Sequence, residues 1–323
     1  MPIPLALIAA ALTGIQAAPL DAAQMQHLLR EALKGPVPCT AAAIEKRLKP
    51  TLEKLGPYFY WESPTRLGGE PGYLIGFSYG ALDDAVSAVA TLEPLRGHLL
   101  ATVVDAGQVM GSGTGIFYDA SAYVRGNRLV VCGPANDGSN TNWPKVAIYT
   151  RTAAGWHLRS EKIGEPETGT GGVHFGISHG RLTPNRVIVY MRESPMNIGQ
   201  SHAGPQLTAR AVWRVSGDRV TVGPAHTLPT ALFALDQIAG AAQSGESADF
   251  NRLVPRKYRK VVRAVCSSSL SVTCAHDDEK DDAHDFYVLS TDDPHYGDGR
   301  GHFIFAKRHG AWRLVKFTDE KTD

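Results

Sequence analysis

The chain lacks a strong charge of either sign. Its 323 residues include 33 Lys and Arg against 32 Asp and Glu, which gives a formal net charge of +1. Nucleic-acid-binding surfaces and polybasic membrane patches both need clustered positive charge, so the composition favours neither kind of partner. No stretch reaches 18 uninterrupted apolar residues, so no membrane insertion of the mature chain is expected.

The chain also lacks the residue spacings that bind metals and phosphates. No CxxC or HxxxH pair occurs, and the acidic stretches 276–285 and 292–300 lack the alternating order of a calcium loop. The glycine-rich segments 110–115 and 168–172 neither open a helix nor carry GK[ST], so they predict linkers or wide turns. We therefore expect no metal and no cofactor, and the histidines at 157, 174, 179, 202 and 226, each alone in its segment, are interpreted as structural.

The N-terminus is typical of a secretory signal peptide. An apolar run of about twelve residues, from Pro4 to Ile15, is too short for a membrane span, and small residues suited to signal peptidase follow it at Ala17 and Ala18. The run has no Lys or Arg before it, so a buried N-terminal helix is the alternative. The sequence thus predicts a signal at 1–18 and a secreted or periplasmic protein.

Cysteine is scarce, with four residues at Cys39, Cys132, Cys266 and Cys274. Four thiols allow three disulfide pairings, and Cys266 and Cys274 bracket a short polar run that can close on itself. In an exported chain these two form the predicted disulfide. In a chain that stays in the cytoplasm, four unpaired thiols are expected instead.

Residues 115–226 look like one pattern written twice. The first copy contains GNRLVVCGP and KVAIYTRTAAGWHLRSE, and the second contains PNRVIVYMRES and LTARAVWRVSGDRVTVGP. Each copy predicts four short strands of an antiparallel meander. If Val189 and Trp213 of the second copy face the core, Trp213→Ala should cost about 3 to 5 kcal/mol, whereas an exposed Trp213 would favour a binding surface. Two such units are too few to close a propeller, so a sandwich or an open propeller-like stack is expected.

Two predicted helices and an aromatic run precede this region. Apolar spacing predicts a helix within 19–35, and Thr40 is a suitable N-cap for a second helix that Pro50 interrupts. The run from Tyr58 to Trp61 is interpreted as a strand that enters a core rather than as a ligand platform.

One motif carries catalytic chemistry. Residues 76–80 read GFSYG, between a strand-like segment and a stretch, 81–92, with apolar residues on one helical face. The stretch resembles the nucleophile elbow of the α/β-hydrolase family, which implies Ser78 as a nucleophile activated by a histidine. Too few βα units precede it, and a second match at 176–180 falls where a hairpin turn is expected. A structural turn is therefore the preferred interpretation, and no catalytic residue is assigned.

From Leu228 the composition changes to a helix rich in alanine and leucine, a Ser-Gly break at 244–245, and a second helical piece. About four strands follow, and the last contains GAWRLV. Residues 228–323 resemble the NTF2-like (SnoaL-like) α+β family, and this resemblance implies a pocket that could bind a small molecule or support catalysis.

The sequence as a whole predicts a mainly β fold with α+β parts. The expected organisation is a signal peptide at 1–18, a helical cap at 19–56, a β-rich domain at 57–227 and an NTF2-like domain at 228–323. The leading functional hypothesis is a non-enzymatic exported binding or structural module, whose partner would be an extracytoplasmic protein or a small molecule. Such a module should lack a cluster of titratable residues. The alternatives are a serine hydrolase using Ser78 and a binder or enzyme with an NTF2-like pocket.

Overall fold

The structure is a computed structural model. It describes residues 20–56, 58–80, 85–108, 116–117, 120–136, 142–164, 174–183, 185–193, 195–198, 207–267, 270–274, 284–290 and 300–320. The predicted signal at 1–18 and the glycine-rich segments 110–115 and 168–172 lie outside these residues. Within them, no helix is long and apolar enough to cross a membrane.

The fold is mainly β, as the sequence predicts, with four antiparallel sheets whose strands largely follow chain order. The chain divides into two compact units. The first comprises Met1–Pro166, Phe175–Tyr190 and Ala211–Pro224. The second comprises Glu167–His174, Met191–Arg210 and Ala225–Asp323.

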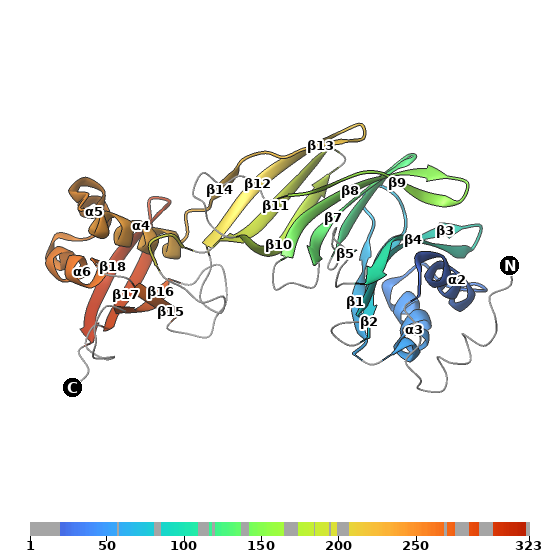
Figure 1. Ribbon diagram of the computed structural model, residues 1–323, viewed down its shortest axis with the longest axis horizontal. Coiled ribbons are helices and arrows are strands. Elements are labelled where there is room, and N and C mark those ends of the chain that lie inside the picture. Colours follow the sequence, from blue (N-terminus) through green and yellow to red (C-terminus); the bar gives the residue numbers. More distant parts are fainter. Residues whose placement is uncertain are drawn as a thin grey trace. The chain divides into compact units, whose positions relative to one another are not determined.

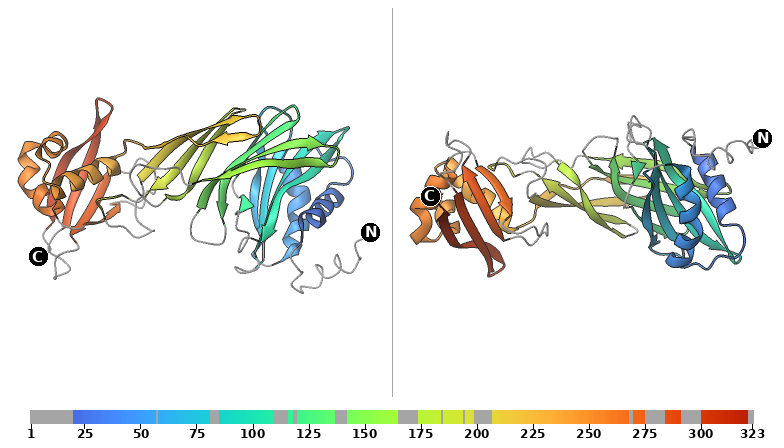
Figure 2. Two further views of the ribbon diagram at one scale, coloured as in Figure 1. Left: turned by 45° about the horizontal axis from the view of Figure 1, so that its top comes forward. Right: turned by 90° about the horizontal axis from the view of Figure 1, so that it is seen from below.

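The first unit begins with two helices that cover one face of a four-stranded sheet (Figures 1 and 2). The helical elements are α2 (Ala22–Ala32), α3 (Ala41–Leu52) and the 3₁₀ turn η1 (Glu53–Leu55). The sheet, called sheet A, has the order β1 (Tyr60–Arg66), β2 (Tyr73–Tyr79), β3 (Val86–Leu95) and β4 (His98–Gln108).

The second N-terminal helix starts after its predicted N-cap Thr40, and the first starts after Asp21, which was not predicted as an N-cap. The Asp21 side chain accepts a hydrogen bond from Gln24 N at 2.8 Å, and Thr40 Oγ1 accepts one from Ala43 N at 3.3 Å. Helix α3 continues through Pro50 to Leu52, so the expected break at the proline is absent. Met25, Leu29, Ile44 and other apolar residues of the helices bury one side against β2 and β3.

The second sheet of this unit, sheet B, contains the first copy of the predicted repeat. Its order is β5 (Ile116–Phe117), β7 (Arg128–Asn136), β8 (Asn142–Thr152) and β9 (Gly155–Ile163), and β6 (Ser121–Arg125) also pairs with β7. Sheets A and B share one apolar cluster, with Leu74 and Val89 from sheet A and Leu129, Ala147 and Tyr149 from sheet B. Sheet A therefore lies between a layer of helices and a second sheet.

The second copy of the repeat forms a sheet of its own, with residues in both units. Its strands are β10 (His174–Thr183), β11 (Arg186–Glu193), β12 (Leu207–Ser216), β13 (Arg219–Thr221) and β14 (Ala225–Thr227). The predicted repeat is thus confirmed as two sheets with the same strand order, each with one short extra strand. Val189 and Trp213 are wholly buried, so of the two alternatives for Trp213 the structure has the one that faces the core.

The C-terminal elements belong to the second unit and form a sheet with helices on one face (Figure 1). The helical elements are α4 (Ala231–Gln243), α5 (Ser247–Leu253), the 3₁₀ turn η3 (Arg256–Tyr258) and α6 (Arg259–Cys266). The strands, in order, are β15 (Leu270–Cys274), β16 (Asp285–Ser290), β17 (Arg300–Arg308) and β18 (Ala311–Glu320). The helix-facing side of this sheet is filled by buried aromatic residues, including Phe286, Phe303 and Phe305.

Two local interpretations of the sequence are wrong. The stretch after GFSYG is a strand from Val86 to Leu95, and no βα elbow forms there, because Ser78 lies within β2 between β1 and β3. The second GxSxG match, at 176–180, lies inside strand β10 rather than in a hairpin turn. In both cases strand pairing with neighbours overrides the local pattern.

Candidate functional site

The face of sheet A that meets sheet B changes from apolar to polar along its strands. Leu74 on β2 and Val89 on β3 are buried in the shared cluster. Toward one end of the sheet, Gly76 lies two residues after Leu74 on β2, and Ser87 lies two residues before Val89 on β3. Ser78 of β2 is paired directly with Ser87. Ser78 and Ser87 are only partly buried. The sandwich is therefore closed by apolar side chains in the middle and lined by polar groups at this end.

A carboxylate from β1 lies across this polar end. Glu62 is paired with Gly76, and an added Cβ at Gly76 would come within 2.1 Å of Glu62 Oε2. A side chain at position 76 would push the flexible end of Glu62 aside, so glycine leaves room for the carboxylate in this position. The first glycine of GFSYG thus has a structural role, because it allows the Glu62 side chain to lie over β2.

A second carboxylate group gathers around Lys145 of β8. Lys145 Nζ lies 2.9 Å from Asp105 Oδ2 on β4 and 3.4 Å from Glu161 Oε2 on β9. The Lys145 side chain is 3% exposed, Asp105 16% and Glu161 29%. The backbone N–H of Phe117 also donates to Asp105 Oδ2 at 3.4 Å, and the Lys145 ammonium lies 4.6 Å from the centre of the Phe117 ring.

The buried phenol of Tyr149 belongs to the same environment. Burial raises the pKa of Tyr149 well above its ordinary value, and the negative charges of Asp105 and Glu161 raise it further. Tyr149 therefore stays a neutral hydroxyl at physiological pH. We call the set Glu62, Ser78, Ser87, Asp105, Lys145, Tyr149 and Glu161 the acidic end of the sandwich.

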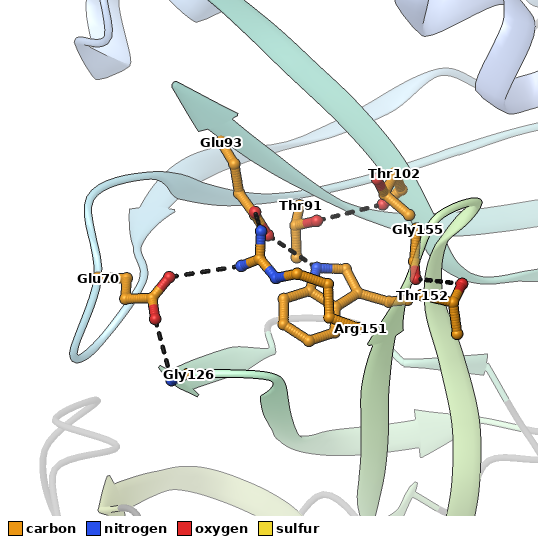
Figure 3. Close-up of polar contacts among 9 residues, drawn as sticks. Glu70, Thr91, Glu93, Thr102, Gly126, Arg151, Thr152 and Gly155 are labelled. Carbon is orange, nitrogen blue, oxygen red and sulfur yellow. Dashed lines mark hydrogen bonds and ion pairs between the residues drawn. The ribbon is translucent and has the colours of Figure 1, made fainter. Parts of the chain in front are cut away.

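The opposite end of β8 carries a second cation with its own acid partners (Figure 3). Arg151 NH1 lies 2.7 Å from Glu93 Oε2 on β3, and Arg151 NH2 lies 3.4 Å from Glu70 Oε2. Its guanidinium stacks 4.4 Å from the centre of the Trp156 ring, and Trp156 Nε1 donates to Glu93 Oε1 at 2.7 Å. Gly126 N donates to Glu70 Oε1 at 3.0 Å. This cluster joins sheets A and B, because Glu93 of β3 contacts both Arg151 of β8 and Trp156 of β9.

The comparisons with known proteins give little guidance. No family model matches the chain, and no curated protein matches it. The chain is similar to a solved structure of a thermostable family-43 glycoside hydrolase, at 12% sequence identity over 81% of this chain and 77% of that one. The TM-score is 0.29, which is too low to carry an argument about this chain's activity.

The prediction of a non-enzymatic binding or structural module is nevertheless wrong. That hypothesis required the absence of a titratable cluster, whereas the acidic end brings Asp105, Lys145 and Glu161 within ion-pair distance. The sequence showed no sign of this cluster because its members are separated by up to 56 residues and follow no local motif.

The predicted serine nucleophile lies at the acidic end but has no catalytic partner there. Ser78 makes no hydrogen bond to any histidine among the residues that the structure describes. Within the same residues no group of three or more His, Cys, Asp or Glu is placed to hold a metal ion. Serine-histidine chemistry at position 78 therefore has no support in this geometry.

A separate titratable pair lies on the C-terminal sheet. His302 Nε2 hydrogen-bonds Asp285 Oδ1, and the His302 ring stacks on Tyr287 with 4.5 Å between ring centres. Asp285, Tyr287 and His302 alternate with Phe286 and Phe303, so they lie on the face opposite the helices. Of the acidic stretches 276–285 and 292–300, only His284, Asp285 and Arg300 are among the described residues.

A buried carboxylate in the same unit has a structural role. Asp236 of α4 accepts hydrogen bonds from Asn197 N at 2.8 Å and from Asn197 Nδ2 at 3.2 Å. Burial raises the pKa of Asp236, while the hydrogen bonds from Asn197 and Met196 partly oppose that rise. Gly240 lies so close to Asn197 that an added Cβ would come within 2.8 Å of its side chain. The segment 195–198 is therefore fixed on α4.

The cysteines in the described residues are free. Cys132 and Cys266 are buried, Cys39 is partly buried, and none of the three is in a disulfide. Burial raises the pKa of the Cys132 and Cys266 thiols to about 12. The side chain of Cys274 lies outside the described part of the chain. The predicted bond between Cys266 and Cys274 is not formed in this structure, and its presence in the exported protein stays a prediction.

Proposed function

We propose that the chain is a hydrolase that cleaves glycosidic bonds by carboxylate acid–base catalysis at the acidic end of the sandwich. The observation that carries this proposal is that Glu62 of β1 and Asp105 of β4 lie in one row on the same face of sheet A, joined through the pairs with Gly76 and Val89. Glycoside hydrolysis needs two carboxyl groups that flank the bond to be cut, and it needs no metal or cofactor.

The ion pair with Lys145 divides the roles between the two carboxyl groups. Asp105 lies 2.9 Å from the Lys145 ammonium, which holds its carboxylate in position to act as base or nucleophile. Glu62 is then the general acid, which gives its proton to the leaving oxygen as the bond from that oxygen to the sugar carbon breaks. Water supplies a hydroxyl to the carbon and returns a proton to a carboxylate, so the reaction balances without another reactant.

The neighbouring groups support this arrangement. Lys145 is held by Asp105 and Glu161 together, so it cannot rotate away without leaving two carboxylates unpaired. The hydroxyls of Ser78 and Ser87 are partly exposed, and they are donors and acceptors suited to the hydroxyl groups of a sugar.

The test is a panel of 4-nitrophenyl glycosides and soluble polysaccharides, with release of nitrophenol and of reducing ends measured against pH. The expected result is hydrolysis of at least one sugar class with a bell-shaped pH profile, and a loss of about 100-fold or more in kcat for Glu62→Gln and Asp105→Asn. Glu31→Gln on helix α2 is the matched control, because its carboxylate is exposed and distant in sequence from the site. Full activity of Glu62→Gln, or no turnover of any glycoside by the folded protein, would refute the proposal.

A further inference from the structure

Two exposed tyrosines lie at the start of β1. Tyr58 is 81% exposed and Tyr60 is 58% exposed, while Phe59 and Trp61 pack against the cluster formed by the helices and sheet A. The aromatic run was expected to enter a core, and only half of it does. Its other half presents two rings to solvent next to β1, the first strand in the order of sheet A.

Tyr60 lies in the same row as the polar residues of the site. It is paired with Ser78, which is paired with Ser87, and its side chain lies on the same face as Glu62 two residues along β1. Tyr60 therefore lies next to the polar residues that line the acidic end. Among the described residues neither Tyr58 nor Tyr60 has a side-chain hydrogen bond to protein.

The backbone at Tyr58 is held in an unfavourable conformation. Its φ is +55°, in the left-handed region that residues other than Gly, Asn and Asp rarely adopt. A strained backbone that persists at an exposed aromatic residue is a recognised indication of function, because burial gives no compensating gain there.

We propose that Tyr58 and Tyr60 form an aromatic subsite that binds a sugar ring of an extended polysaccharide beside the acidic end. This inference rests on the proposed glycosidase activity for the class of ligand. A tyrosine ring offers an apolar surface with a hydroxyl at its tip, which matches the apolar C–H face and polar rim of a pyranose. Because the rings lie beside an outer strand rather than within the sandwich, they suit a long chain that continues past the cleaved bond.

The test measures binding separately from cleavage. The full chain carrying Glu62→Gln, which removes the proposed acid, is tested by affinity electrophoresis in soluble xylan, β-glucan and glycol chitin and by depletion on insoluble cellulose. The expected result is retardation by at least one polysaccharide, weakened about tenfold when Tyr58→Ala and Tyr60→Ala are added. Tyr60→Phe, which keeps the ring, should retain most of the binding.

The control variant is Leu158→Ala, which removes an exposed apolar side chain on β9 that is 42% exposed and should leave binding unchanged. Circular dichroism and urea denaturation confirm that each variant folds. Equal binding by the double tyrosine variant and its parent would overturn the subsite, and so would absence of binding to every polysaccharide. Binding that depends on the tyrosines in a protein without hydrolytic activity would refute the catalytic proposal and support the subsite.

Discussion

Sheet A and the C-terminal sheet are both covered by helices on one face, but their opposite faces differ. The second face of sheet A packs on sheet B, and its charged groups pair with groups of the other sheet, as in Lys145 with Asp105 and Arg151 with Glu93. On the C-terminal sheet the titratable pair Asp285 and His302 comes from two adjacent strands of the same sheet. Charges buried between two layers must find partners across the layers, whereas charges on one sheet are paired by its own register.

The largest expected loss of stability comes from removing a cation that pairs with an acid of the other sheet. Lys145→Met should lower the free energy of unfolding by about 3 to 5 kcal/mol, because Asp105 and Glu161 are left partly buried without their cation. Lys162→Met, at the next position to Glu161 on β9 but exposed, should cost under about 0.5 kcal/mol. Urea denaturation measures both. A similar small loss in the two variants would mean that Lys145 does not hold the two sheets together.

The next prediction concerns the buried acid of the second unit. Asp236→Ala removes the acceptor for Asn197 N and should cost about 2 kcal/mol. Asp236→Asn keeps an acceptor oxygen and should cost less. If the two substitutions destabilise the protein equally, the hydrogen bonds to Asn197 are not what the carboxylate contributes.

Asp236 should also impose a pH dependence whose sign follows from its raised pKa. Because the native pKa lies above the unfolded one, the native state binds more protons in the interval between them. The contribution of Asp236 is therefore greatest below the ordinary range of an aspartate and falls as the pH rises through the native value. Asp236→Asn should flatten this decline in denaturation midpoints measured from pH 3 to 8, and an unchanged profile would contradict the assignment.

A smaller effect is expected for the pair within one sheet. Asp285→Asn should lower stability by about 1 kcal/mol, because the side chains of Asp285 and His302 are 19% and 16% exposed and retain some contact with solvent. A double-mutant cycle with His302→Gln isolates their coupling, and Asp319→Asn on β18 is the exposed control. A loss as large as that of Lys145→Met would abolish the distinction between the two regions.

The smallest expected effect is chemical rather than energetic. Iodoacetamide at pH 8 should modify Cys39 in the folded protein and leave Cys132 and Cys266 unmodified, because their buried thiols have pKa values raised to about 12. Non-reducing peptide mapping of protein from the native host tests the predicted Cys266 to Cys274 bond, and its intact mass tests cleavage after Ala17 or Ala18. Rapid labelling of Cys266 would show that the second unit opens under native conditions.

Strand and helix positions were predictable from local patterns, whereas the candidate site was not. The predicted N-cap Thr40 lies at the beginning of α3, and the repeat predicts two meander sheets because period-2 burial and turn residues are local signals. The segment 86–95 misleads, because its apolar residues fit a helical face while both faces of the strand are buried by different layers. The NTF2-like resemblance of 228–323 and the secretory signal stay predictions.

The acidic end depends on how strands far apart in the chain are placed. Glu62 and Asp105 come to one face because β1 and β4 belong to the same sheet, and Lys145 reaches Asp105 because sheet B packs on sheet A. No pattern within a window of the sequence encodes these distances. Gly76 does belong to a local motif. It is the first glycine of the GxSxG motif that resembles a hydrolase elbow, but in the structure it leaves room for the Glu62 carboxylate.

The two cations of β8 also fix how the two sheets of the first unit are aligned. Lys145 and Arg151 are six residues apart, and Ala147 and Tyr149 of the apolar cluster lie between them. Apolar side chains alone would tolerate a shift of sheet B by two residues along sheet A, because such a shift returns the same faces to contact. With a cation at each end, that shift would move one of them into the apolar cluster and remove both from their acids. The alignment of the layers is therefore selected by charge, and the position of Lys145 against Asp105 is selected with it.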